Sequence, residues 1–92
     1  MDKYRIFETE QFLGDLTQDF EGQGERIRKK LLEYVYPLLR NNPYFGKNIK
    51  RLKNYKPDTW RYRIGGHRFF YEINEKERMV YMITADSRKD SY

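Results

Sequence analysis

The chain has 92 residues, a formal net charge of +5 and no cysteine. This length suits a single domain (1–92) with one core, and the lack of cysteine excludes a disulfide scaffold. No stretch has the length and apolarity of a signal peptide core or a membrane-spanning helix, so we expect a soluble, cytoplasmic protein with no membrane partner.

The first part of the chain predicts a strand followed by two helices. Residues 3–7 are β-prone, and Thr9 can cap a helix whose apolar side chains recur at four-residue spacing from Phe12. A glycine-containing turn at 22–24 leads into a second helix. Its expected core face comprises Ile27, Leu31, Tyr34, Val35 and Leu38. Pro37 lacks an amide hydrogen, so we expect a kink there, with the helix continuing to Asn41.

Residues 43–57 form a basic connection without clear periodicity. Residues 47–71 together carry eight basic side chains and one acidic side chain, Asp58, a balance typical of a polyanion-binding surface. The candidates for anion binding in this connection are Lys47, Lys50, Arg51, Lys53 and Lys56. A solvated loop is the alternative interpretation for each lysine taken singly.

The stretch from Trp60 to Tyr71 predicts a β-hairpin. Apolar residues alternate with arginine up to Ile64, and Gly65-Gly66 suits a two-residue primed turn before a second β-prone run. This turn sets the register, so that Arg63 faces Arg68 and Arg61 shares their face of the sheet. Three guanidinium groups on one face repel one another, which favours an anion-binding site there. The alternative is that these arginines only solvate an outer sheet face.

Two expectations follow from this face. No carboxylate pair is expected beside it, and replacing Arg68 with alanine is expected to leave folding stability unchanged or slightly higher, because repulsion with Arg63 is relieved. The single histidine and the absence of cysteine leave no metal site, and no phosphate-loop or dinucleotide fingerprint is present. We therefore expect no metal and no cofactor.

Residues 79–84 form a continuous apolar run, which predicts a central strand covered on both faces, followed by a short polar tail from Ala85. The predicted order is strand, helix, helix and three strands. This order indicates an α+β fold, with two N-terminal helices packed on a twisted antiparallel sheet of about four strands.

The hairpin block, together with Asn42-Pro43 before it and the closing Arg88-x-x-x-Tyr92 after it, resembles the RelE/ParE toxin superfamily of type II toxin–antitoxin systems. The resemblance spans nearly the whole chain. It implies a RelE-like fold and a cognate antitoxin as partner. For the RelE branch it implies ribosome-dependent cleavage of messenger RNA, whereas the ParE branch inhibits DNA gyrase.

The resemblance also implies roles for individual residues. Basic residues of RelE-like toxins match Arg61 and Arg63 on the first hairpin strand and Arg68 after the turn. An arginine in the tail matches Arg88, and a tyrosine near the end matches Tyr92. Family members often carry lysine on the hairpin strand, and arginine, unlike lysine, cannot deprotonate to act as a base. The basic connection before the hairpin would extend the RNA-binding surface.

The leading hypothesis is therefore an mRNA interferase, a metal-independent endoribonuclease in which a ribose 2′-hydroxyl attacks the adjacent phosphate. The three hairpin arginines would stabilise that phosphate. Tyr92 or His67 would transfer the proton, and Arg88 would lower the phenol's pKa or protect the leaving group. The alternatives are a gyrase inhibitor without nuclease activity and a non-enzymatic RNA- or ribosome-binding module.

Overall fold

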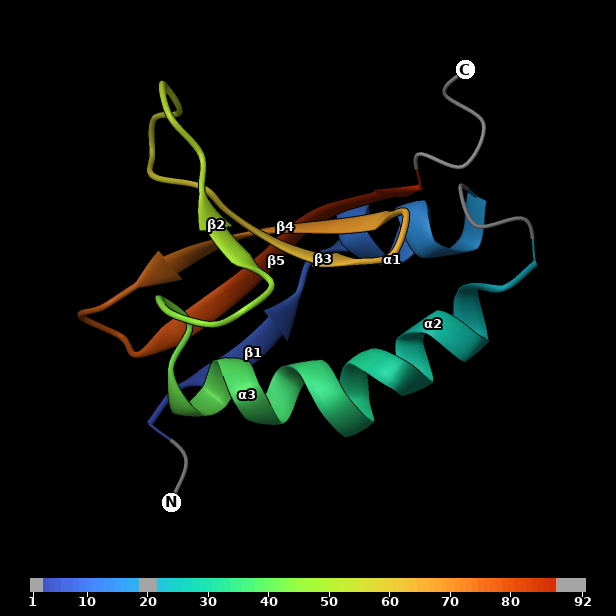
Figure 1. Cartoon of the computed structure of the whole chain (residues 1–92), viewed down its shortest axis with the longest axis horizontal. Helices are drawn as coiled ribbons and strands as arrows, with labels where there is room; N and C mark the ends of the chain where they lie inside the picture. Colours follow the sequence, from blue (N-terminus) through green and yellow to red (C-terminus); the bar gives the residue numbers. More distant parts are fainter. Residues whose placement is uncertain (1–2, 19–21, 88–92) are drawn as a thin grey trace.

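The computed structural model describes residues 3–18 and 22–87. A five-stranded sheet organises the molecule, and the helices cover one of its faces (Figure 1). The strands are β1 (Arg5–Glu8), β2 (Ile49–Arg51), β3 (Trp60–Ile64), β4 (His67–Asn74) and β5 (Met79–Ser87), in the spatial order β1-β5-β4-β3-β2. The predicted α+β class is confirmed.

The sheet differs from the expected one in two respects. It is mixed, because β1 runs parallel to β5 while all other neighbours are antiparallel. It also contains the extra strand β2, within the basic connection that shows no periodicity. β2 has only three residues and lies at the sheet edge, where charged residues such as Lys50 are common. A strand so short and so charged leaves no alternating pattern in the sequence.

The helical part begins with α1 (Glu10–Gln18). Thr9 caps α1 as predicted, because its hydroxyl oxygen accepts the amide hydrogen of Phe12 at 3.2 Å. The same hydroxyl donates to the carbonyl oxygen of Met82 at 2.8 Å, which joins the helix start to β5. α2 (Gly24–Lys30) then approaches α1 so closely that a Cβ atom at Gly24 would overlap the carbonyl oxygen of Leu16.

A π-helical turn, η1 (Leu31–Val35), connects α2 to α3 (Tyr36–Asn41) without a break. The amide of Tyr36 donates to the carbonyl of Leu31, five residues earlier. We attribute this wide turn to Pro37, whose ring would clash with the carbonyl of residue 33 in a regular α-helix. The helix thus continues past Pro37, as expected.

The π-helical turn also changes which side chains face the core. Leu31, Val35 and Leu39 are buried at four-residue spacing, whereas Tyr34 and Leu38 are 65% and 56% exposed. The predicted core face is therefore wrong at Tyr34 and Leu38. A regular period of 3.6 residues places them inward, but the extra residue of the wide turn rotates them out of the core.

The core lies between these helices and the inner face of the sheet. Its largest buried side chains include Phe12 and Tyr36 from the helices, and Phe69, Tyr71 and Met82 from the strands. β5 is central, as predicted, but it is fully covered on one face only. Its inner residues are buried, whereas Tyr81 on the outer face is half-buried and packs edge-on against Phe7, with ring centroids 5.7 Å apart.

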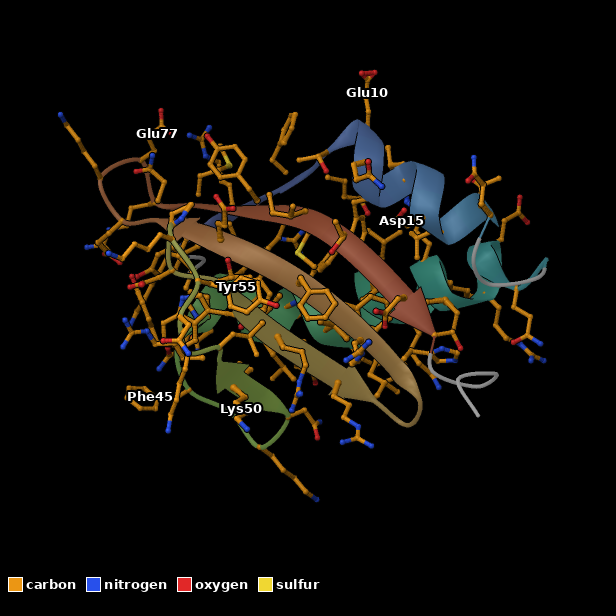
Figure 2. All side chains as sticks on the ribbon, turned by 90° about the horizontal axis from the view of Figure 1, so that it is seen from above. Glu10, Asp15, Phe45, Lys50, Tyr55 and Glu77 are labelled. Carbon is orange, nitrogen blue, oxygen red and sulfur yellow. The ribbon has the colours of Figure 1, made fainter. Side chains whose placement is uncertain are left out.

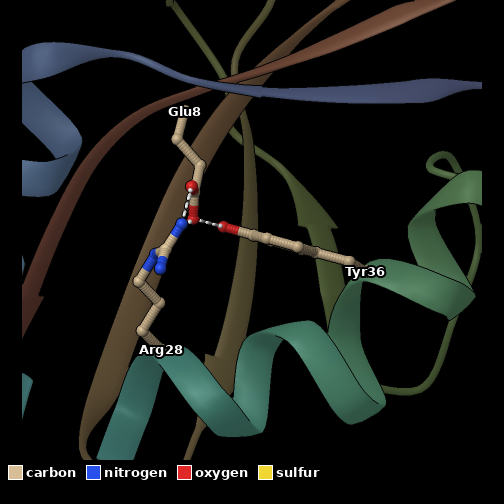
Figure 3. A network of polar contacts seen from close by, with 3 residues as sticks. All are labelled: Glu8, Arg28 and Tyr36. Carbon is tan, nitrogen blue, oxygen red and sulfur yellow. Dashed lines mark hydrogen bonds and ion pairs between the residues drawn. The ribbon is translucent and has the colours of Figure 1, made fainter. Parts of the chain in front are cut away.

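A polar network joins β1 to the continuous helix formed by α2, η1 and α3 (Figure 3). The Glu8 carboxylate accepts hydrogen bonds from Nη2 and Nε of Arg28, at 2.8 and 3.3 Å, and from the Tyr36 hydroxyl at 2.8 Å. Tyr36 is 1% exposed. Its burial, reinforced by the bond to Glu8, raises the pKa of its hydroxyl, which therefore stays a neutral donor.

A second network fastens the turn between β4 and β5. The hydroxyls of Tyr4 and Tyr44 both donate to Glu75 Oε1, at 2.8 and 2.6 Å, and Arg78 Nε lies 3.2 Å from Glu75 Oε2. The hydrogen bond from Tyr44, and to a smaller extent the one from Tyr4, lowers the pKa of the Glu75 carboxyl. Among the described residues, no helix is long and apolar enough to cross a membrane.

Candidate functional site

The β3–β4 hairpin has the register that Gly65-Gly66 predicts. Arg63 lies opposite Arg68, and Arg61 lies opposite Phe70. Gly65 adopts a φ of 55°, the left-handed conformation that a primed turn requires and that glycine adopts without strain. The predicted common face of the three arginines is therefore confirmed.

Neighbouring strands extend this outer face into two rows of side chains. Lys50 of β2 pairs with Arg61, and paired residues of antiparallel strands point to the same side of a sheet. In the next row, Arg63 and Arg68 are followed by Asp86 of β5. The basic groups thus come from three strands that are separate in sequence.

A pocket of about 370 Å³ lies at the β2 side of this face. Four cationic side chains line it, together with Asn48 and Ile49: Lys47, Lys50, Arg61 and Arg63. No carboxylate is among these lining residues. We call this the cationic pocket, and an anion with several oxygen atoms, such as a phosphodiester, matches its donors.

Arg61 is the most unusual member of the cationic pocket. Its side chain is partly buried, and its Nε has no hydrogen-bond partner within the described part of the chain. By contrast, Arg63 is exposed, and its Nε donates to the carbonyl oxygen of Gly65 at 3.1 Å. A buried donor without an acceptor costs free energy, and a bound anion would remove that cost.

Arg68 has a different environment from the one expected. Its Nε and Nη2 donate to Asp86 Oδ1 and Oδ2 at 2.8 and 2.7 Å, and its guanidinium lies 5.5 Å from the centre of the Phe70 ring. A single carboxylate, that of Asp86, lies beside Arg68, and it is not expected from the sequence. β5 extends to Ser87 instead of ending before Ala85, which brings Asp86 opposite Arg68 and offsets the repulsion from Arg63.

The other predicted catalytic residues lie elsewhere or outside the described residues. His67 alternates with Arg68 along β4, so its side chain lies on the inner side of the sheet, in line with Phe69. His67 pairs with Ile64 on one side and with Ser87 on the other. Arg88 and Tyr92 fall outside the described residues.

The predicted RNA-binding residues separate into two groups. Lys47 and Lys50 line the cationic pocket. Arg51 pairs instead with Asp58, with 3.1 Å between Nη2 and Oδ1, and Lys53 and Lys56 are exposed in the loop between β2 and β3. Only the first group adjoins the hairpin arginines within one pocket.

Five of the described tyrosines are poorly suited to remove a proton. Burial is the main cause that raises the pKa of Tyr4, Tyr36, Tyr44 and Tyr71, and a hydrogen bond to Glu77 raises that of Tyr81. A general base must lose its own proton near neutral pH, and a raised phenol pKa opposes this. These tyrosines act as structural donors.

The sequence interpretation misses two residues that shape the site. Asp86 compensates Arg68, and the signal for it is weak, namely that polar residues occupy the alternate positions 84 and 86 at the end of the apolar run. Phe45 is 80% exposed in a loop beside the cationic pocket. No local pattern distinguishes it from an aromatic residue that anchors the loop to the core.

The comparison with protein families identifies one family. The model of the family described as ParE toxin of type II toxin-antitoxin system, parDE, matches residues 9–92. No curated protein matches the sequence.

Several solved structures share the fold over nearly the whole chain. The RelBE2 toxin–antitoxin complex from Mycobacterium tuberculosis matches with a TM-score of 0.74 and 23% identity, over 94% of this chain and 99% of that chain. The archaeal RelE–RelB complex from Pyrococcus horikoshii OT3 has a TM-score of 0.68 and 19% identity, over 96% and 98%. The YoeB dimer from Staphylococcus aureus has a TM-score of 0.67 and 20% identity, over 91% and 95%. At these identities the similarity shows a common fold.

Proposed function

Because the chain belongs to the ParE toxin family of type II toxin–antitoxin systems and has a RelE-like fold, we propose that it is a ribosome-dependent endoribonuclease. It would cleave messenger RNA in the ribosome and so inhibit translation. The observation that carries this proposal is the cationic pocket, in which Lys47, Lys50, Arg61 and Arg63 converge and the buried Nε of Arg61 has no acceptor among the described residues.

The proposed reaction needs no group beyond the RNA and the chain. The ribose 2′-oxygen attacks the adjacent phosphorus, the bond from phosphorus to the 5′-oxygen breaks, and a cyclic 2′,3′-phosphate and a 5′-hydroxyl result. Negative charge grows on the non-bridging oxygens during the attack, and Arg61 and Arg63 are placed in one pocket to donate to them.

Two protons must move in this reaction. One leaves the 2′-hydroxyl and one reaches the 5′-oxygen. Tyr92 and His67 stay our candidates for these transfers, with Arg88 assisting, and His67 would have to act from the inner side of the sheet. Comparing Tyr92→Phe with His67→Gln under single-turnover conditions on purified ribosomes separates them, because only the change at the working residue should slow cleavage.

We further propose a cognate antitoxin as the partner of this protein. The structures from M. tuberculosis and P. horikoshii are complexes of a toxin with its antitoxin. An acidic segment of such a partner would complement the cationic pocket and compete with RNA for it.

A second candidate function is inhibition of DNA gyrase without nuclease activity. The matching family model is that of ParE, which favours this reading. It requires no proton transfer, so it predicts that changes at Tyr92 and His67 leave toxicity unaltered.

A paired assay tests the two candidates. The purified protein is added to a reconstituted translation system, where message cleavage is mapped by primer extension, and to a gyrase supercoiling assay. We expect cleavage of translated message, its loss in the double variant Arg61→Ala/Arg63→Ala, and its retention in Lys76→Ala, which removes a charge at the distant β4–β5 turn. Inhibited supercoiling without cleavage would reject the nuclease in favour of gyrase inhibition. Stalled translation with intact message would point to a non-enzymatic ribosome-binding module.

A further inference from the structure

A second pocket adjoins the cationic pocket and has a different character. It encloses about 310 Å³, and its apolar lining comes from Leu38 of α3, Phe45 of the following loop, Ile49 of β2 and Tyr62 of β3. Both pockets are lined by Lys47, Asn48 and Ile49, so one wall serves both. We call this second hollow the apolar pocket.

Phe45 lines the apolar pocket, and a hydrogen bond holds its backbone in place. The side-chain oxygen of Asn42 accepts the amide hydrogens of Tyr44 and Phe45, at 3.0 and 3.3 Å. Tyr44 is held in turn by its hydrogen bond to Glu75 and by edge-on packing against Trp60, with ring centroids 5.2 Å apart. The Phe45 ring itself is 80% exposed, so it contributes little to the core.

Phe45 and the cationic groups belong to one end of the molecule. Figure 2 shows Phe45 and Lys50 at the same side of the molecule, near β2, and the two pockets share the lining residues Lys47, Asn48 and Ile49. A ligand that fills both pockets must therefore carry a flat apolar group close to a group with negative charge.

We infer that the apolar pocket receives a nucleobase of the RNA strand whose phosphate occupies the cationic pocket, with the Phe45 ring as its stacking platform. This inference rests on the proposed function. It adds a binding site for the nucleobase, whereas the basic groups of the cationic pocket would bind the phosphate. A nucleotide joins a planar π face to a phosphate through one sugar, which matches two adjoining pockets of this kind. Stacking of this type tolerates every base, so it adds affinity without strong sequence preference.

The test compares two strands that differ only in their bases. The binding of a fluorescent single-stranded RNA oligonucleotide, carrying 2′-O-methyl groups to prevent cleavage, is measured by anisotropy at low ionic strength. An abasic strand of the same length is the second ligand. We expect the parent protein to prefer the strand with bases by about 10- to 100-fold.

Variants at Phe45 identify the origin of that preference. Phe45→Leu keeps an apolar side chain but removes the ring, so it should abolish the preference and leave binding of the abasic strand unchanged. Phe45→Trp should keep the preference. The matched control is Tyr34→Leu, since Tyr34 is an aromatic residue with 65% exposure that lines neither pocket. Melting temperatures should be the same for all of these variants.

The outcomes separate this inference from the proposed function. Equal affinity for both strands, or an unchanged preference in Phe45→Leu, overturns the nucleobase site. The cationic pocket still stands in that case if Arg61→Ala weakens binding of both strands. A preference that depends on Phe45, combined with no effect of Arg61→Ala, instead removes the proposed phosphate site. Failure of both strands to bind overturns both proposals.

Discussion

Arg61 and Arg68 lie in adjacent rows of one sheet face, yet their guanidinium groups differ in what they contact. Arg68 forms a two-pronged ion pair with Asp86, whereas the Nε of Arg61 has no acceptor within the described residues. The ion pair holds the Arg68 guanidinium in a fixed position on the face. Arg61 is the residue whose Nε can accept a bound anion as partner without losing an existing hydrogen bond.

Replacing Arg61 with alanine should reduce activity and spare the fold. Removing one donor to a developing oxyanion typically slows a reaction by about 100- to 1,000-fold. The unfolding free energy should change by less than about 0.5 kcal/mol, because an unsatisfied donor is lost and the crowding of positive charge is relieved. Single-turnover cleavage on ribosomes and urea unfolding measure the two effects. A loss of several kcal/mol on unfolding would identify Arg61 as a structural residue.

Arg68 and Asp86 should be coupled in stability. Contrary to the expectation from sequence, Arg68→Ala should lower the unfolding free energy, because it leaves the Asp86 carboxylate without its partner. A double-mutant cycle with Asp86→Ala should give a coupling of about 1 kcal/mol, since the pair is two-pronged but 28% and 38% exposed. Additive effects of the two single changes would show that the ion pair contributes nothing to folding.

At the level of elements, the hairpin is the part that sequence predicts best. Its alternation and its Gly65-Gly66 turn are local signals, and local signals suffice for a two-residue connection. The parallel pairing of β1 with β5 and the strand β2 depend on contacts between distant segments. The π-helical turn has a local cause, Pro37, but a wide turn leaves no periodicity that a regular helical pattern would predict. The same holds for the site: the row of arginines is predicted, whereas Asp86 and Phe45 enter it only through the fold.

The junction of β1 with the helix should be sensitive to one carboxylate. Glu8→Ala removes the acceptor of the buried Tyr36 hydroxyl and should lower the unfolding free energy by about 1–3 kcal/mol. Arg28→Ala is the matched control, because Arg28 is a more exposed partner of the same carboxylate and should cost less than about 1 kcal/mol. Thermal or urea unfolding measures both variants. Equal losses would argue against the Tyr36 bond as the main contribution.

The β4–β5 turn should make stability depend on pH through Glu75. The pKa of Glu75 is lowered in the folded protein, so its ionised form stabilises the fold above the unfolded pKa of about 4.3. This contribution disappears as pH falls through the folded pKa. The parent should therefore melt higher than Glu75→Gln at pH 7, and the difference should vanish in acid. Tyr44→Phe should reduce the difference, because its hydroxyl is the main cause of the shift.

For the whole molecule, with its net charge of +5, we expect charge to contribute most of the affinity for the proposed RNA ligand. Binding of a single strand loses affinity with salt at a slope of about −0.7 for each phosphate neutralised. If each of the four basic groups of the cationic pocket meets one phosphate, the slope of log K against log salt should be about −3. Arg61→Ala removes one phosphate contact and should make this slope shallower by about 0.7, whereas Lys76→Ala should not alter it. A salt-independent affinity would contradict an electrostatic site.

The position of β5 in the sheet also determines when the protein can fold. β5 lies between β1 and β4, yet it is synthesised after every other described strand. Before residues 79–87 leave the ribosome, β1 has no strand to pair with, and α1 lacks the surface on which it packs. The sheet can therefore be completed only after β5 has been synthesised.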